Sequence, residues 1–469
     1  MTDPTDDAEL VRRVASEMRD HYAYTGALGW LRHGKRGVWK PINDRQMLHV
    51  VMRRLEEIAA ELAQDDALPR PSPRSVKLLR QTRKAESVMR PLAGALTVEL
   101  GDFDQNPADL NCPNGVVDLR TGELRQHQPS DRFLLCASAP FEPGATSPAW
   151  AAATAAMTEQ TLQWMQLRLG QAITGETPPD DRILFLQGGG ENGKSLFVTG
   201  LQTALGDYAK ALPHRVLLAS PGDHPTELME LRGLRLGILE ELPEGRYLNV
   251  QRLKATVGTS RISARLIRRD SVQFDATHAL IVTTNYMPQI AETDAGTWRR
   301  LVMIPFPFRY VSVPTAGTNE RPRDDTLKTA LQIRDPAVLA WLIEGAVRYY
   351  NDPEAFREVP EEVRLATASW RDDADLIGQF FEEEIELDEG NFVASARLAE
   401  RFNKWLEPQG HQRMNVRTFM SRWRSTESIA SLMAAGVIAE AQGQGLDGRK
   451  AKGVRGIRLR EMTYDHEYE

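Results

Sequence analysis

The chain has 469 residues, of which 41% are hydrophobic and 26% charged, and its net charge is −7. This length exceeds one compact core, so we expect two to four domains. No stretch approaches the roughly 18 uninterrupted apolar residues of a membrane span, and the acidic start does not look like a secretory signal. The two cysteines, Cys112 and Cys136, exclude a disulfide framework and predict a reducing compartment such as the cytoplasm.

The first 145 residues are expected to form a mainly α-helical domain. Apolar residues recur at helical spacing between residues 8 and 65, with a turn or hairpin at 26–40, and a third helix is predicted over 75–92. Segments 114–119 and 121–124 surround a polar glycine turn and predict a β-hairpin. The third helix carries basic residues that we expect to form a solvated face, namely Lys77, Arg80, Arg83 and Lys84.

Residues 188–195 read Gly-Gly-Gly-Glu-Asn-Gly-Lys-Ser and match G-x-x-x-x-G-K-[ST]. An apolar run at 183–186 predicts a buried strand before the loop, and 196–205 predicts a helix after it. In this context glycines let backbone N–H groups point at an anion, and the helix N-terminus adds positive charge. A glycine-rich turn that matches by accident is the alternative. We predict that ATP and Mg²⁺ bind here through Gly188, Gly190, Asn192, Gly193, Lys194 and Ser195.

Within this loop Lys194 is expected to reach the β- and γ-phosphates, and Ser195 to bind the magnesium ion. The apolar strand predicted at 234–239 ends in two carboxylates, Glu240 and Glu241. We assign the metal role to Glu240 and the role of general base for the attacking water to Glu241. A charged pair at a surface strand end is the alternative.

Two further groups needed for nucleotide hydrolysis follow along the chain. The predicted strand 278–285 ends in Asn285, which we interpret as a sensor that bonds the γ-phosphate or the lytic water, although asparagine also begins turns. Arg299 and Arg300 precede another apolar strand, at 301–306, and are candidates for an arginine finger acting on a neighbour's nucleotide. Spacing does not say which arginine is the finger, and a salt bridge to Asp294 is the alternative.

Basic residues between the acidic strand and Asn285 predict a DNA contact. Two short strands, 262–267 and 272–274, would form a hairpin whose charged tip grips a phosphate backbone inside a channel. A solvated loop is the alternative. The residues concerned are Lys254, Arg261, Arg265, Arg268 and Arg269.

The last part of the chain, 376–469, is expected to be a small module after a helical connector at 311–375. Three short helices and a closing strand pair predict a winged-helix-like DNA-binding domain. Alternation in 456–460 would place arginines on one strand face. A basic surface on a structural cap is the alternative. Positive charges in this tail are Arg449, Lys450, Lys452, Arg455, Arg458 and Arg460.

Taken together, these ordered motifs resemble superfamily 3 helicases, specifically the phage- and plasmid-type primase–helicases related to the poxvirus primase–helicase. The resemblance includes the loop Gly-Glu-Asn-Gly-Lys-Ser, Thr-Asn-Tyr-Met-Pro at 284–288, and Trp-Arg-Arg at 298–300 followed by Ile-Pro-Phe at 304–306. Three features depart from it: Glu240 precedes Glu241, Gly258-Thr259-Ser260 replaces Gly-Gly-Asp, and the polymerising primase domain has no room here.

The resemblance implies an AAA+-like α/β P-loop NTPase core at 150–310, between the helical N-terminal domain and the winged-helix-like domain. It implies a ring, commonly a hexamer, with nucleotide at subunit interfaces and single-stranded or forked DNA through the middle. Our first hypothesis is a 3′-to-5′ DNA helicase that replicates a mobile element in the bacterial cytoplasm, with a separate primase or initiator and no membrane partner. A DNA-binding NTPase switch that loads a partner, or a P-loop kinase, are the competing hypotheses.

Overall fold

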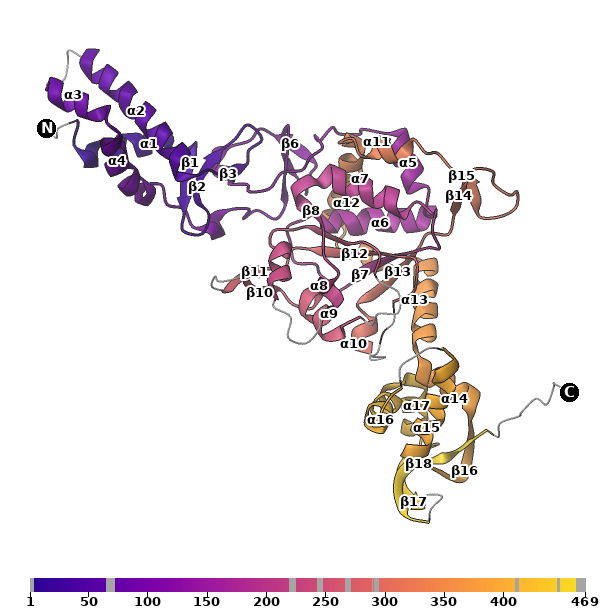
Figure 1. Cartoon of the computed structure of the whole chain (residues 1–469). Coiled ribbons are helices and arrows are strands. Elements are labelled where there is room, and N and C mark those ends of the chain that lie inside the picture. Colours follow the sequence, from indigo (N-terminus) through magenta and orange to yellow (C-terminus); the bar gives the residue numbers. More distant parts are fainter. Residues whose placement is uncertain are drawn as a thin grey trace.

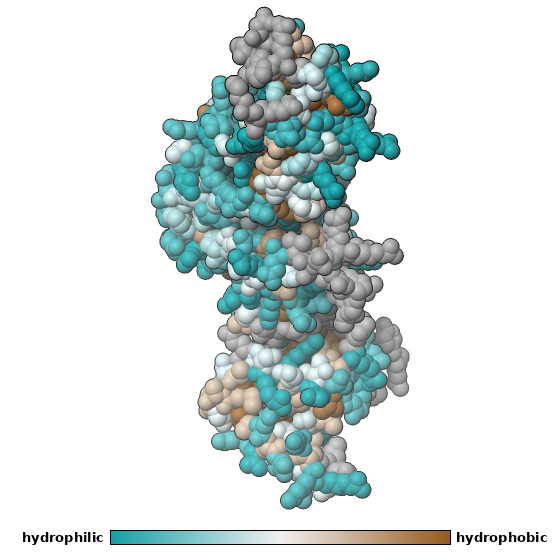
Figure 2. All heavy atoms as spheres, turned by 90° about the vertical axis from the view of Figure 1, so that its left-hand side faces the viewer, coloured by the Kyte–Doolittle hydropathy of each residue, from teal (hydrophilic) through white to brown (hydrophobic). Residues whose placement is uncertain are grey.

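The computed structural model describes residues 4–64, 72–218, 225–242, 248–265, 271–288, 290, 295–409, 413–444 and 448–460. The fold is mixed α/β, with a helical N-terminal region, a central parallel sheet and a small C-terminal α/β region arranged in an elongated shape (Figure 1). Hydrophilic residues cover most of the face seen from the N-terminal side (Figure 2). Among the described helices, none combines the length and apolar composition needed to cross a bilayer. The limits of the four expected domains stay predictions.

The N-terminal region confirms the predicted helices and refines two of the expectations. Segment 26–40 belongs to a three-stranded antiparallel sheet. The predicted helix 75–92 is wrong as a single element, because Gln81 is extended (φ −94°, ψ 138°) and divides it in two. The elements are α1 (Asp7–Met18), β1 (Tyr22–Thr25), β2 (Gly29–His33), β3 (Trp39–Pro41), α2 (Asp44–Gln64), α3 (Pro73–Leu79) and α4 (Thr82–Ala95).

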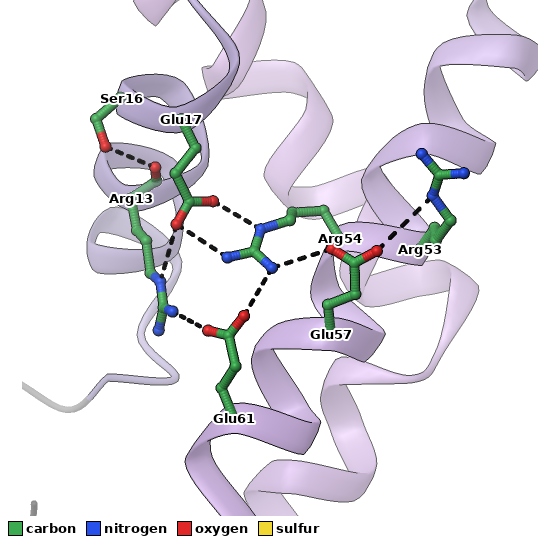
Figure 3. A network of polar contacts seen from close by, with 7 residues as sticks. All are labelled: Arg13, Ser16, Glu17, Arg53, Arg54, Glu57 and Glu61. Atoms are coloured by element: carbon green, nitrogen blue, oxygen red, sulfur yellow. Dashed lines mark hydrogen bonds and ion pairs between the residues drawn. The ribbon is translucent and has the colours of Figure 1, made fainter. Parts of the chain in front are cut away.

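An ion-pair network joins α1 to α2 on the surface of this region (Figure 3). The Arg54 guanidinium donates to the carboxylates of Glu17, Glu57 and Glu61, at 2.6 to 3.0 Å. Arg13 donates to Glu17 and Glu61 as well. The hydrogen bonds from Arg54 lower the pKa of Glu17 and of Glu61. One partly buried arginine therefore crosslinks two helices through several charges.

Replacing Arg54 by methionine is expected to weaken local stability at pH 7 by about 1–2 kcal/mol, because several charge-assisted bonds are lost together. Hydrogen exchange of the α1 and α2 amides measures this. Because the folded-state pKa values of Glu17 and Glu61 are lowered, the stabilisation is present above the usual glutamate value of 4.5 and is lost as pH falls through the lowered values. Arg53→Met is the matched control, since Arg53 is 70% exposed and lies 3.9 Å from Glu57. Equal losses for the two variants would contradict the role of the network.

The hairpin predicted at 114–124 is confirmed and gains a strand that the sequence pattern missed. β5 (Gly115–Asp118) pairs with β6 (Glu123–Arg125), with Val117 opposite Leu124. The missed strand, β4 (Asp109–Cys112), pairs with the other edge of β5. Two helices then lead to the central sheet. The elements of this connection are η1 (Leu100–Asp102), η2 (Pro129–Asp131), α5 (Pro148–Thr154) and α6 (Glu159–Ala172).

Five parallel strands form the central sheet in the order β13-β7-β12-β9-β8. All the long predicted strands are confirmed, and the three-residue edge strand β8 was not expected. The sheet is buried on both faces, as parallel sheets are, with α6, α7 and α12 on one face and α8, α9 and α10 on the other (Figure 1). The strands are β7 (Ile183–Gln187), β8 (Ala209–Ala211), β9 (Leu236–Leu239), β12 (Ala279–Thr284) and β13 (Leu301–Pro305).

The strand order decides where the functional residues lie. Because all five strands are parallel, their carboxyl ends meet at one edge. β12 lies between β7 and β9, so the segments that follow these three strands are neighbours there. The helices and turns around the sheet are α7 (Lys194–Leu205), η3 (Gly206–Tyr208), α8 (Arg215–Leu218), η4 (Pro225–Leu231), α9 (Val250–Val257), α10 (Ala295–Trp298), α11 (Leu327–Leu331), α12 (Pro336–Asn351), η5 (Ala355–Arg357) and α13 (Glu361–Ala374).

Two small strand pairs project from the core. β10 (Arg261–Arg265) pairs antiparallel with β11 (Ser271–Asp275), which confirms the predicted hairpin. Its tip, with Arg268 and Arg269, lies outside the described residues. β14 (Arg309–Val311) pairs parallel with β15 (Glu320–Pro322), and this pair was not expected. Asp335 caps α12 by accepting from the Ala337 N–H at 2.9 Å.

The C-terminal region contains the three predicted helices and the closing strand pair, with a further helix, α17, and a further strand, β16. The strands form an antiparallel sheet in the order β16-β18-β17. Aromatic residues, Phe380, Phe402, Phe419 and Trp423, fill its separate core. The elements are α14 (Leu376–Glu384), β16 (Ile385–Ala394), α15 (Ser395–Leu406), η6 (Glu407–Gln409), α16 (Val416–Ser425), α17 (Glu427–Ala434), β17 (Ala439–Gln444) and β18 (Lys450–Leu459).

Candidate functional site

The loop between β7 and α7 has the backbone of an anion-binding site. Gly190, Glu191 and Gly193 take left-handed φ values of 95°, 52° and 83°, and glycine does so without a steric cost. A Cβ on Gly188 would lie 1.6 Å from the side-chain nitrogen of Asn192. Gly193 caps α7 without a side-chain hydrogen bond. The N–H groups of the first helical turn are thereby left for a ligand.

Lys194 lies at the centre of this loop and is 5% exposed. Its Nζ donates to the Gly188 carbonyl at 2.7 Å, to Asn192 Oδ1 at 3.0 Å and to Asn285 Oδ1 at 3.1 Å. Desolvation by burial lowers the pKa of Lys194 to about 8, and the charge of Glu241 partly opposes this. A bound anion would stabilise the protonated ammonium further. The loop therefore surrounds a buried ammonium group, which favours the binding of an anion.

A cavity of about 370 Å³ brings most of the predicted site residues together. Glycine-loop residues 190–196 line it, and so do Glu241 from the end of β9 and Thr283 and Asn285 from the end of β12. The Glu241 N–H donates to Thr283 Oγ1 at 3.3 Å. Of the predicted ligand-binding residues, Gly188 does not line the cavity. Its carbonyl accepts the hydrogen bond from Lys194. Three neighbouring strands therefore deliver an ammonium, a carboxylate and an amide to one cavity.

The structure separates the two adjacent carboxylates. Glu240 does not line the cavity, and its carbonyl accepts a hydrogen bond from His214 Nε2. Glu241 lines it and has a left-handed φ of 46°. Both residues follow the end of β9 at Leu239, and at this left-handed turn the second carboxylate of the pair lines the cavity while the first does not. The predicted metal role of Glu240 is the part of the site that the geometry does not favour.

The two candidate finger arginines lie away from their own chain's cavity. They precede β13 at the amino edge of the sheet, about one five-residue strand or roughly 16 Å from the loop edge. The Arg300 side chain is 9% exposed and donates to Asp181 Oδ2 at 2.7 Å. That of Arg299 is 65% exposed and lies 3.3 Å from the same carboxylate. The salt bridge considered in place of a finger thus forms with Asp181, while Asp294 lies outside the described residues.

The predicted DNA-binding residues fall in two separate places. Lys254 lies on α9, and Arg265 ends β10 opposite Ser271, beside the core. The C-terminal residues lie on or next to β18, at the far end of the molecule (Figure 1). Arg458 is paired with Glu386. Exposed side chains at this end are those of Arg449, Lys450, Lys452 and Arg455.

A local irregularity in β18 leaves both Arg455 and Arg458 exposed, although residues three apart in a regular strand lie on opposite faces. Val454 and Ile457 are both buried, although simple alternation would put them on opposite faces. Gly456 lies between them with a φ of 93°, and a Cβ there would lie 2.4 Å from the Val437 carbonyl. Arg455 and Arg458 are therefore both turned outward, so the predicted basic face extends beyond residues 456–460.

One wall of the cavity was not expected from the sequence. Tyr310, Arg323 and Lys328 line it together with Ala152 and Ala153 of α5. These residues lie more than 100 positions from Lys194, or before the loop, and match no motif. The turn-rich segment that follows the apolar strand has no sequence pattern that predicts which part of the core it packs against.

Two protein-family models match parts of the chain that lie before and after the glycine loop, Glu241 and Asn285. Residues 11–166 match a family model described as D5 N terminal like, and residues 372–425 match one described as Poxvirus D5 protein-like. The predicted resemblance to primase–helicases related to the poxvirus protein is therefore confirmed.

Curated relatives at low identity carry helicase and primase names. "Putative primase C962R" of African swine fever virus (strain Badajoz 1971 Vero-adapted) is 25% identical over 305 residues, which are 60% of this chain and 31% of that protein. "Putative helicase L207/L206" of Acanthamoeba polyphaga mimivirus is 26% identical over 220 residues, 45% of this chain and 23% of the relative. "Putative helicase 022R" of Frog virus 3 is 26% identical over 238 residues, which are 48% of this chain and 24% of that protein.

The chain thus spans between 23% and 31% of the length of these relatives. They come from large DNA viruses of eukaryotes, and the bacterial host of the mobile element stays a prediction. Among solved structures, the apo C-terminal region of NrS-1 covers 96% of this chain and 99% of its own, with 10% sequence identity and a TM-score of 0.47.

Proposed function

We propose that this chain is the motor of a ring-forming, ATP-dependent DNA helicase that acts in replication. The observation that carries the proposal is the meeting of Lys194, Glu241 and Asn285 in one cavity beside a loop of backbone donors. Hydrolysis of a nucleoside triphosphate needs a phosphate cradle, a base for the attacking water and a polar group that reads the terminal phosphate. The end of a separate strand supplies each of these three groups.

The residues present fit ATP and a magnesium ion. The cavity volume lies within the range of about 300–1,000 Å³ typical of ligand sites. Magnesium prefers oxygen ligands and keeps several from phosphate and water, and the Ser195 hydroxyl and the Glu241 carboxylate belong to residues that line the cavity. Within the described residues no group of three or more histidine, cysteine or carboxylate side chains forms an all-protein metal site, which agrees with a cation shared with phosphates.

In the proposed site each side chain has one task. Bound ATP with magnesium supplies the phosphoryl group that is transferred to water. The Lys194 ammonium balances charge on the phosphate oxygens, and Ser195 offers its hydroxyl to the metal ion. Glu241 accepts the proton of the attacking water, while Asn285 holds Lys194 and orients the terminal phosphate or the water. Glu240 has no part in the proposed site, because it does not line the cavity.

DNA contacts are proposed for the hairpin β10–β11 and for the C-terminal region. The C-terminal helices α15 and α16, followed by the strand pair β17–β18, are the elements expected of a winged helix, with Lys450 and Lys452 exposed near the tip of the strand pair. The helicase and primase names of the relatives support action on DNA. The 3′-to-5′ direction rests on the family resemblance.

Strand displacement from a forked DNA tests the proposal. An excess of unlabelled trap strand keeps the released strand from reannealing. Under these conditions we expect the labelled strand to be displaced when the fork carries a 3′ single-stranded tail and ATP is present, and not when it carries a 5′ tail alone. Lys194→Ala protein is the matched control and should displace nothing. Turnover that single-stranded DNA stimulates without any displacement would instead identify a loader or switch. Turnover that DNA leaves unchanged would count against both functions.

A further inference from the structure

We propose that the cavity wall formed by Tyr310, Arg323 and Leu327, facing Ala152 and Ala153 of α5, is the nucleoside subsite of the proposed ATP site. This inference rests on the proposed function, because it assigns the part of the same ligand that the glycine loop does not hold. The ligand class is a nucleoside triphosphate whose base contacts the Tyr310 ring. The wall would thus distinguish a nucleotide from a bare polyphosphate.

The two ends of the cavity differ in chemistry, and this gives the ligand a direction. Glu241, Thr283 and Asn285 form an end lined by hydrogen-bonding groups, as the terminal phosphate and the attacking water require. Lys194, the first residue of α7, bonds Asn285 at this end, and Gly193 just before it lies beside the Tyr310 ring on the opposite wall. That wall offers the Tyr310 ring and the alkyl groups of Ala152, Ala153 and Leu327 as partners for a base, beside the charged side chains of Arg323, Asp324, Asp325 and Lys328. A triphosphate bound along the loop therefore directs its nucleoside toward Tyr310.

Tyr310 is fixed to the glycine loop by its backbone. Its N–H donates to the Glu191 carbonyl at 2.7 Å, and β14 pairs with β15 so that Tyr310 lies opposite Arg321. A Cβ built on Gly193 would meet the Tyr310 ring at 3.5 Å. Burial raises the pKa of the phenol, so the ring is neutral at physiological pH. The ring consequently lies beside the N-cap of α7 and moves with the loop.

Arg323 places a cation of this wall next to the glycine loop. Its guanidinium lies 3.4 Å from the Glu191 carboxylate and 3.0 Å from that of Asp325, and its side chain is 43% exposed. Arg309 contacts the same Glu191 carboxylate at 3.4 Å. Two arginines from β14 and the residue after β15 thus hold the middle of the glycine loop. Because Arg323 also lines the cavity, its charge is available to the phosphate nearest the nucleoside.

Titration calorimetry with two ligands tests the subsite. ATP and inorganic tripolyphosphate, each with magnesium, share the phosphate chain and differ in the nucleoside. We expect Tyr310→Ala to weaken ATP binding on the order of 10-fold, as loss of one aromatic stacking partner does, and to leave tripolyphosphate binding unchanged. Tyr310→Phe keeps the ring and should keep ATP affinity. Arg323→Ala should weaken both ligands, because its partner is phosphate.

Phe308→Ala is the matched control on the same segment, since the Phe308 ring stacks on Arg321 at 4.5 Å and does not line the cavity. It should leave both affinities unchanged. Equal weakening of ATP and tripolyphosphate by Tyr310→Ala would show that the ring only shapes the loop, and unchanged ATP binding would remove it from the site; either result overturns the subsite. Wild-type protein that binds tripolyphosphate as tightly as ATP overturns the subsite and leaves the phosphate loop standing. Wild-type protein that binds neither ligand ends the proposed function as well.

Discussion

Lys194→Ala is expected to lower nucleotide turnover by about 10²–10³-fold or more, the loss typical when one preorganised charge donor is removed from a transition state. The Lys194 ammonium is buried, and it bonds the loop through Gly188 and Asn192 and the strand end through Asn285. Alanine removes the cation and also leaves three oxygens, the Gly188 carbonyl and the side-chain amide oxygens of Asn192 and Asn285, without their shared donor. Steady-state phosphate release, with and without single-stranded DNA, measures the effect.

The control for this variant is another lysine-to-alanine change outside the cavity. Lys210 is 54% exposed and is paired with Glu230 at the edge of the sheet. Lys210→Ala should therefore retain turnover and thermal stability. Hydrolysis at the wild-type rate in Lys194→Ala protein would show that the loop is not the site of the reaction, whatever the fate of DNA binding.

The sequence was sufficient to predict the centre of the site because its signals are local. A buried strand, a glycine loop and a helix follow one another at 183–205, and each is recognisable from its own residues. Glu241 and Asn285 were predicted because each ends an apolar strand that follows the loop, and nucleotide hydrolysis needs a carboxylate and a polar sensor. Their meeting with Lys194 depends on β12 lying between β7 and β9.

The parts that escaped prediction depend on tertiary packing or on single backbone angles. Tyr310 reaches the cavity because β14 bonds the loop at Glu191, and no periodic pattern encodes that contact. The choice of Glu241 over Glu240 follows from one left-handed residue at the strand end. The division of the helix predicted over 75–92 follows from the extended conformation of Gln81. Composition and spacing do not determine such angles.

The paired arginines are expected to separate into a functional and a structural residue. Arg299 is exposed and Arg300 is buried against Asp181, so the geometry favours Arg299 as the finger. Arg299→Ala should lower turnover by about 10³-fold or more, as loss of an arginine finger does, with nucleotide affinity and melting temperature unchanged. Arg300→Ala should instead destabilise the fold by about 2–3 kcal/mol, because it breaks a partly buried ion pair. Kinetics and thermal melting of both variants measure the difference.

Mixing two inactive proteins then tests whether Arg299 acts on a neighbour. In a mixed ring, an Arg299→Ala protomer keeps its own Lys194 and Glu241, and a Glu241→Gln protomer keeps its own Arg299. Wherever the second protomer follows the first, one complete interface forms, because the arginines lie at the sheet edge opposite to their own cavity. Turnover should therefore reappear on mixing and peak near equal amounts of the two proteins. If the mixtures stay as inactive as either protein alone, or if Arg299→Ala protein retains full turnover, the charge does not come from a neighbouring subunit.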